Sequence, residues 1–118
     1  TQISEPMSTG MSIASDGEIS VVYCTVPSTD ASGIAHELIE RRLIACVNIL
    51  PVRSLYRWAG HVCDDQEELL IMKTATRLVP DLVTAITAIH PYTTPEVIAL
   101  PVSQGYRGYL DWVIAETS

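Results

Sequence analysis

The chain has 118 residues, 14 of them acidic and seven basic, which gives a formal net charge of −7 at pH 7 and a sequence pI of about 4.7. A chain of this length hides roughly two thirds of its unfolded surface and fits one compact domain. The acidic balance opposes a nucleic-acid partner, because phosphate binding needs clustered Lys and Arg. Lys73 is the only lysine in the sequence.

The sequence also argues against a membrane partner and a disulfide framework. No apolar run approaches the ~20 residues that span a bilayer, and the first 17 residues lack the pattern of a signal peptide. The three cysteines, Cys24, Cys46 and Cys63, are an odd number and include no Cys-x-x-Cys pair. We therefore expect a cytoplasmic location, where cysteines stay reduced.

The first half of the chain alternates strand and helix signals. Residues 1–17 are rich in Ser, Thr, Gly and Pro and predict a flexible leader, which leaves residues 18–118 as the single domain. Residues 18–26 are β-branched and aromatic and predict a central strand. Three helix-capping residues follow, and residues 31–43 then repeat apolar side chains at helical spacing.

The second half of the chain again alternates predicted strands and helices. We expect a second strand over 45–50 that Pro51 bends or ends, with 54–58 extended beyond it. The other predicted segments are a hairpin connection over 61–66, a strand over 68–74, a helix over 77–89, a loop over 90–96, a strand over 97–100 and a helix over 109–115.

This order predicts an α+β fold of the ferredoxin-like β-α-β-β-α-β plan with a short C-terminal helix. Both helices of such a fold cover one sheet face. Side chains alternate along a strand, so we expect that the apolar strand positions do not all face the helices. These positions are Val22, Cys24, Val47, Ile49, Leu70 and Met72. The uncovered apolar face would then favour an oligomer.

Six segments in this order resemble the CutA family of small divalent-cation tolerance proteins. They are VVYCTVP (21–27), ACVNILP (45–51), SLYRWAG (54–60), LIMKT (70–74), HPYTTPEVIALPV (90–102) and YLDW (109–112). The resemblance implies a ferredoxin-like protomer packed as a homotrimer. It also implies tolerance of copper and other divalent cations, copper binding in some members, and acetylcholinesterase anchoring in animals. No reaction is firmly attached to the family, so we do not expect an enzyme.

The resemblance implies Cys24, Cys46 and His90 as ligands for copper or another divalent cation. Thiolate and imidazole are ligand types that suit copper and zinc. The alternatives are that both cysteines pack in the core and that a cationic His90 caps a helix. Because a third strand separates the strands that carry the cysteines, we expect separate sites or ligands shared between subunits. Cys63, in the predicted turn with His61, Asp64 and Asp65, is a further metal-compatible position or a solvated turn.

A second group of residues matches positions that, in the family pattern, gather near a cleft between subunits. They are Tyr56, Trp58, Lys73, Tyr92 and Glu96. The Pro-rich loop that carries two of them has the rigidity of a binding loop. The alternative is that Lys73 and Glu96 form a structural ion pair.

The leading function hypothesis is therefore a homotrimeric, copper-binding or divalent-metal-binding tolerance protein. A small-molecule sensor resembling the PII signalling proteins, with ligands in intersubunit clefts, is the alternative from a different class. A trimeric scaffold that recruits a partner protein is the third.

Overall fold

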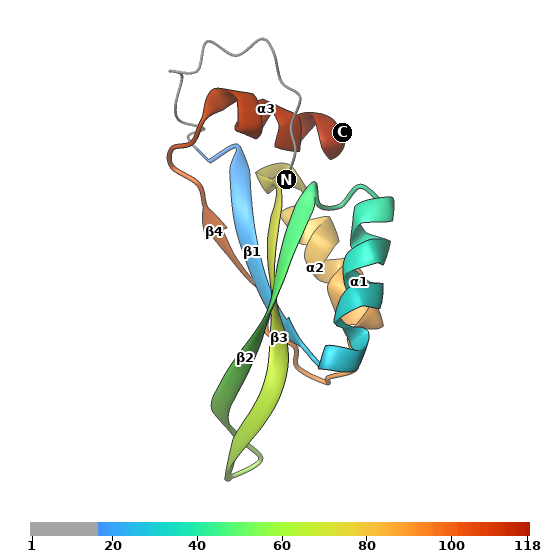
Figure 1. Ribbon diagram of the computed structural model, residues 1–118, viewed down its shortest axis with the longest axis vertical. Coiled ribbons are helices and arrows are strands. Elements are labelled where there is room, and N and C mark those ends of the chain that lie inside the picture. Colours follow the sequence, from blue (N-terminus) through green and yellow to red (C-terminus); the bar gives the residue numbers. More distant parts are fainter. Residues whose placement is uncertain (1–16) are drawn as a thin grey trace.

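The computed structural model describes residues 17–118, so the predicted leader lies, apart from Gly17, outside the described residues. Figure 1 shows the arrangement of the helices and strands. In chain order the elements are β1 (Ile19–Val26), α1 (Ser28–Glu40), β2 (Cys46–Trp58), β3 (His61–Ala75), the short 3-10 helix η1 (Thr76–Leu78), α2 (Val79–Ile89), β4 (Ile98–Pro101) and α3 (Arg107–Glu116).

The strands form one antiparallel sheet in the order β2-β3-β1-β4. β3 lies between β1 and β2, which therefore run parallel, as the ferredoxin-like plan predicts. Helices α1 and α2 lie side by side on one face of the sheet, and α3 crosses one end of it (Figure 1). The predicted α+β class, the order of the elements and the C-terminal helix are confirmed. Within residues 17–118 no helix is long and apolar enough to span a bilayer.

The hairpin of β2 and β3 is much longer than the sequence indicated. Pro51 does not end the second strand, which pairs with β3 without interruption from Cys46 to Trp58. A proline is tolerated there because β2 is an edge strand, whose outer N–H groups are not needed for the sheet. The predicted connection over 61–66 is also wrong, since these residues belong to β3. The hairpin extends beyond the helices at the lower end of Figure 1.

Two residues, Ala59 and Gly60, make the turn of this hairpin. Both have positive φ, 53° for Ala59 and 83° for Gly60. Positive φ at both central residues is the geometry of a type I′ turn, which matches the twist of the paired strands. Glycine adopts this backbone freely, whereas alanine does so at a cost in free energy.

The prediction that the six apolar strand positions divide between two faces is wrong. Within each strand these positions are two residues apart, and the register aligns them, since Met72 lies opposite both Val22 and Val47. All six therefore share the face that α1 and α2 cover. Four of them, together with helix residues such as Leu38 and Leu82, form the main core.

The opposite face of the sheet is nevertheless largely uncovered, as expected. The apolar residues that form it are not the six that we predicted. Val21, Tyr23, Leu69 and Ile71 occupy the alternate positions and are half-buried. Helix α3 packs only against the end of this face, around Ile19. Each edge strand adds exposed apolar side chains to this face, Leu50 and Trp58 from β2 and Ile98 and Leu100 from β4. An open apolar face with two unpaired edges favours association with other copies.

Helix α1 ends earlier than its apolar spacing predicts. Arg42 has a φ of 57°, and the N–H groups of Arg42 and Leu43 donate to the carbonyls of Ile39 and Leu38. This pairing is a Schellman motif, which stops a helix by turning one residue into the left-handed region. The Arg42 side chain also donates to the backbone carbonyl of Glu116 at 3.1 Å, which ties the end of α1 to α3.

We predict that Ala59→Asn stabilises the fold, because asparagine tolerates the left-handed backbone that the turn requires. The expected gain is about 0.5–1 kcal/mol in the free energy of unfolding, measured by denaturant titration at fixed protein concentration. Gly60→Ala is the matched control and should lose stability. A loss of stability in Ala59→Asn would contradict the turn assignment.

Candidate functional site

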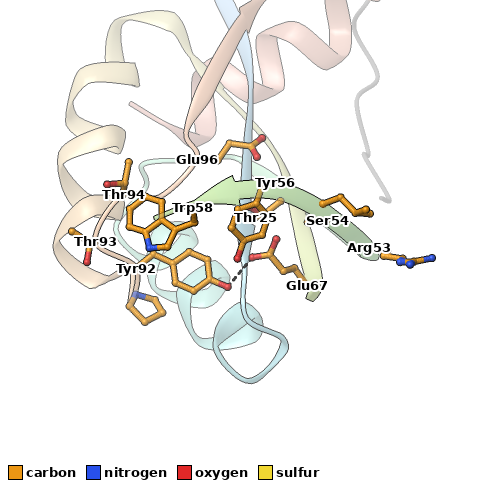
Figure 2. Close-up of a pocket in the computed structure, with 12 residues that line it drawn as sticks. Thr25, Arg53, Ser54, Tyr56, Trp58, Glu67, Tyr92, Thr93, Thr94 and Glu96 are labelled. Carbon is orange, nitrogen blue, oxygen red and sulfur yellow. Dashed lines mark hydrogen bonds between the residues drawn. The ribbon is translucent and has the colours of Figure 1, made fainter. Parts of the chain in front are cut away.

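A cavity of about 700 Å³ lies between the β2–β3 hairpin and the loop that follows α2. It opens on the sheet face away from α1 and α2, since Thr25 alternates with the core residue Cys24. Figure 2 shows the lining side chains. They are Thr25, Arg53, Ser54, Leu55, Tyr56, Trp58, Glu67, Pro91, Tyr92, Thr93, Thr94 and Glu96.

A hydrogen bond between Tyr92 and Glu67 joins the two sides of this cavity. The Tyr92 hydroxyl donates to Glu67 Oε2 at 2.7 Å (Figure 2). Glu67 is only 4% exposed, so its carboxylate has lost most of its contact with water. Burial and the bond to Glu67 raise the pKa of Tyr92 to about 12, so the phenol stays protonated and keeps donating.

His90 fixes the start of the loop that carries Tyr92. One ring nitrogen, Nε2, lies 2.8 Å from the carbonyl oxygen of Thr25, and the other, Nδ1, accepts the Tyr92 backbone N–H at 3.1 Å. Since Nδ1 accepts, the ring is neutral and its proton is on Nε2, which donates to Thr25. His90 is the C-cap residue of α2, as the alternative expected, but its ring binds the carbonyl of Thr25 and not the carbonyls at the helix end. Both nitrogens are occupied, so neither has a free lone pair for a metal ion.

The charged side chains of the cavity are unbalanced. Arg53 is the lining cation, and its guanidinium is held by both carboxylate oxygens of Asp64, at 2.9 and 2.7 Å. Arg53 points away from the other lining residues (Figure 2). Among the described residues, no ion pair involves Glu67 or Glu96. The cavity therefore carries two carboxylates without a neutralising partner.

Cys24 and Cys46 lie on opposite faces of the sheet. Cys24 is fully buried beneath the helices, and burial, followed by the charges of Glu96 and Glu67, raises the pKa of its thiol to about 12. Cys46 is half-buried on the open face, with Sγ 3.4 Å from the Tyr109 hydroxyl. One copy of the chain therefore does not bring both sulfurs to one ion. Across residues 17–118, no three His, Cys, Asp or Glu side chains are grouped to hold a metal.

Cys63 lies in β3, opposite Tyr56, and the predicted turn around it is wrong. Its neighbours point to different sides of the hairpin because side chains alternate along the strand. Asp64 on one side holds Arg53, while Asp65 on the other accepts a hydrogen bond from the Tyr56 hydroxyl. That bond raises the pKa of Tyr56. The carboxylates near Cys63 thus already have partners within the hairpin.

Four of the five predicted cleft residues line the cavity, and Lys73 does not. Lys73 lies opposite Cys46, toward the end of β3 away from the turn, and its ammonium group donates to Asn48. The alternative of a Lys73–Glu96 ion pair is therefore wrong. Sequence reasoning missed Glu67 and Thr25, which only the strand register brings beside the loop.

These features define a small ferredoxin-like protein with an acidic, aromatic-lined cavity. The family model described as CutA1 divalent ion tolerance protein matches residues 20–116. The chain therefore belongs to the CutA1 divalent ion tolerance family.

Individual relatives agree with this assignment. The chain is 52% identical over 99 residues to the "Divalent-cation tolerance protein CutA" of Thermus thermophilus, covering 82% of this chain and 96% of that one. It is 44% identical over 99 residues to "Protein CutA" of Mus musculus, with 82% of this chain but only 56% of the mouse chain covered. A solved structure of the "PII-like protein CutA" from Nostoc sp. PCC 7120 superposes with a TM-score of 0.80 at 35% identity, covering 84% of this chain and 97% of the Nostoc chain.

We predict that Cys24 resists alkylation in the folded protein. Its raised pKa leaves little reactive thiolate at pH 8, and burial excludes the reagent, so labelling should be at least about a hundredfold slower than at Cys63. Peptide mapping after iodoacetamide treatment measures both rates. Denatured protein is the control, in which the two cysteines should react alike. Equal labelling in the folded state would contradict the burial of Cys24.

We also predict that Tyr92→Phe destabilises the protein. The substitution removes the hydroxyl that donates a hydrogen bond to the buried carboxylate of Glu67. The expected loss is about 1.5–3 kcal/mol in the free energy of unfolding, measured by denaturant titration. Tyr106→Phe, at an exposed tyrosine outside the cavity, is the matched control and should change little. Equal effects of the two variants would show that the Tyr92–Glu67 bond contributes nothing.

Proposed function

We propose that this chain acts in divalent-cation tolerance as a cytoplasmic homotrimer without catalytic activity. The observation that carries the proposal is the family match over residues 20–116, together with relatives whose names state the same role. The open apolar face and the unpaired edges β2 and β4 support assembly, since a lone protomer would leave them in water. The free state of all three cysteines supports the cytoplasmic location.

We further propose that copper is a transient cargo and that several copies of the chain bind it together. The described residues of one copy do not fit a resident metal, because Cys24 is a buried thiol and His90 has both nitrogens engaged. Of the three predicted ligands, Cys24, Cys46 and His90, Cys46 is the best placed to bind copper. It lies on the open face at the start of an edge strand, where a neighbouring copy would approach.

Native mass spectrometry of the reduced full chain, with and without stoichiometric Cu(I), tests both parts of the proposal. We expect the mass of three chains and retention of about one copper ion or fewer per subunit, as a shared soft site requires. Cys46→Ser should lose the copper, whereas the matched variant Cys24→Ser should keep it.

Each other outcome removes a defined part of the proposal. A trimer that retains no copper removes the cargo role and leaves the assembly standing. A monomeric mass removes the assembly. Copper loss in Cys24→Ser with retention in Cys46→Ser would exchange the assigned ligands.

A second candidate function is the binding of a small molecule in the cavity. The volume of about 700 Å³ falls within the range of small-molecule sites. The name of the Nostoc protein, which calls it PII-like, supports this candidate by analogy.

A further inference from the structure

We propose that the cavity binds a small organic cation, with a protonated amine or quaternary ammonium group held between its carboxylates and its aromatic rings. This inference rests on the second candidate function, since it names the ligand class of the same cavity. It is independent of copper binding, because Cys24, Cys46 and His90 do not line the cavity.

The first argument is an uncompensated negative charge. Glu67 is 4% exposed, and the Tyr92 hydroxyl gives it a hydrogen bond but no positive charge. A buried carboxylate without a cation is costly, so a ligand that supplies the cation gains binding energy there. Glu96 adds a second carboxylate from the loop side (Figure 2). Arg53 does not offset them, because Asp64 already takes its guanidinium.

The second argument is that the negative potential acts on neighbouring groups. The charges of Glu96 and Glu67 both contribute to the raised pKa of Cys24, beneath the same part of the sheet. Glu67, Asp65 and Asp30 contribute in the same direction at Tyr92. A positively charged ligand is favoured in such a potential, and a phosphate or carboxylate ligand is opposed by it.

The third argument is the aromatic wall. Tyr56, Trp58 and Tyr92 all line the cavity, and Figure 2 labels the three side chains. Aromatic faces attract ammonium groups through the ring quadrupole, and indole does so best. Trp58 and Tyr56 are also partly exposed, so a ligand that covers them removes apolar surface from water.

A bare divalent metal fits these walls less well. Hard metal ions take their ligands from several oxygens, and no group of three ligand-type side chains gathers anywhere in residues 17–118. Aromatic faces offer such an ion no oxygen or nitrogen. An ammonium group carried on a hydrocarbon frame uses the carboxylates and the rings together.

Calorimetric titration of the full chain with two molecules of the same shape tests the proposal. Choline carries a quaternary ammonium group, and 3,3-dimethyl-1-butanol replaces its nitrogen with carbon and is neutral. We expect choline to bind at least about tenfold more tightly than the neutral alcohol, and binding to persist with EDTA present. Succinate, a small dianion, should not bind.

Matched variants locate the interaction. Glu96→Gln, at an exposed position that the fold tolerates, and Glu67→Gln should each weaken choline binding about fivefold to tenfold, because each removes one charge from the cavity. Glu68→Gln removes the same charge from the neighbouring strand position, which does not line the cavity, and should leave binding unchanged. Trp58→Leu should lower the affinity for choline by a larger factor than it lowers the affinity for the neutral alcohol.

The outcomes separate the ligand class from the binding function. Equal affinity for choline and the alcohol, or preference for succinate, would contradict the proposal that the ligand is a cation. Either result would leave the proposal of small-molecule binding intact. An equal effect of Glu68→Gln and Glu96→Gln overturns the assigned position. If none of the three compounds binds, including the case in which a second copy of the chain fills the cavity, both the ligand class and the second candidate function fall.

Discussion

Pairing between β2 and β3 holds the chain in one register from Cys46 opposite Lys73 to Trp58 opposite His61. A shift by one residue would send every side chain of a strand to the other face. The register is fixed by a two-residue turn at one end and by core contacts of Leu70 and Met72 at the other. The faces of the sheet, the uncovered apolar surface and the position of the cavity all depend on it.

The same register separates the two kinds of chemistry that the chain carries. Cys24 packs beneath the helices as a protonated thiol, while Cys46 lies on the open face beside Tyr109. At the end of β1 that carries Cys24, but on the opposite face of the sheet, Thr25 and Glu67 meet the loop that begins at His90. Soft thiol chemistry and the acidic cavity therefore occupy different places. A role in metal tolerance and a small-molecule site can coexist in one protomer without competing for residues.

A chain of hydrogen bonds makes the cavity wall rigid. His90 binds the carbonyl of Thr25, its ring accepts the N–H of Tyr92, and Tyr92 in turn donates to Glu67. Helix α2, strand β1 and strand β3 are thereby linked through one loop. Such preorganisation lowers the entropy lost when a ligand binds, which suits a small molecule that makes few contacts.

The sequence by itself determined the fold class and the order of the elements, because β-branched runs and helical spacing are local signals. The resemblance of six segments indicated the family. It also indicated four cavity residues, Tyr56, Trp58, Tyr92 and Glu96. Local signals failed at two positions. Pro51 was expected to bend or end its strand, but an edge strand accommodates a proline. Ala59 adopts a left-handed backbone, which an alanine in the sequence does not indicate.

Only the tertiary structure decided which residues meet. The opposite faces of Cys24 and Cys46, the partner of Lys73 and the neutral state of His90 all follow from strand register and from contacts between distant segments. Glu67 became part of a cavity because the structure placed Tyr92, 25 residues along the chain, against its carboxylate. Periodicity assigns a residue to a face of its own element, and long-range packing decides what stands opposite that face.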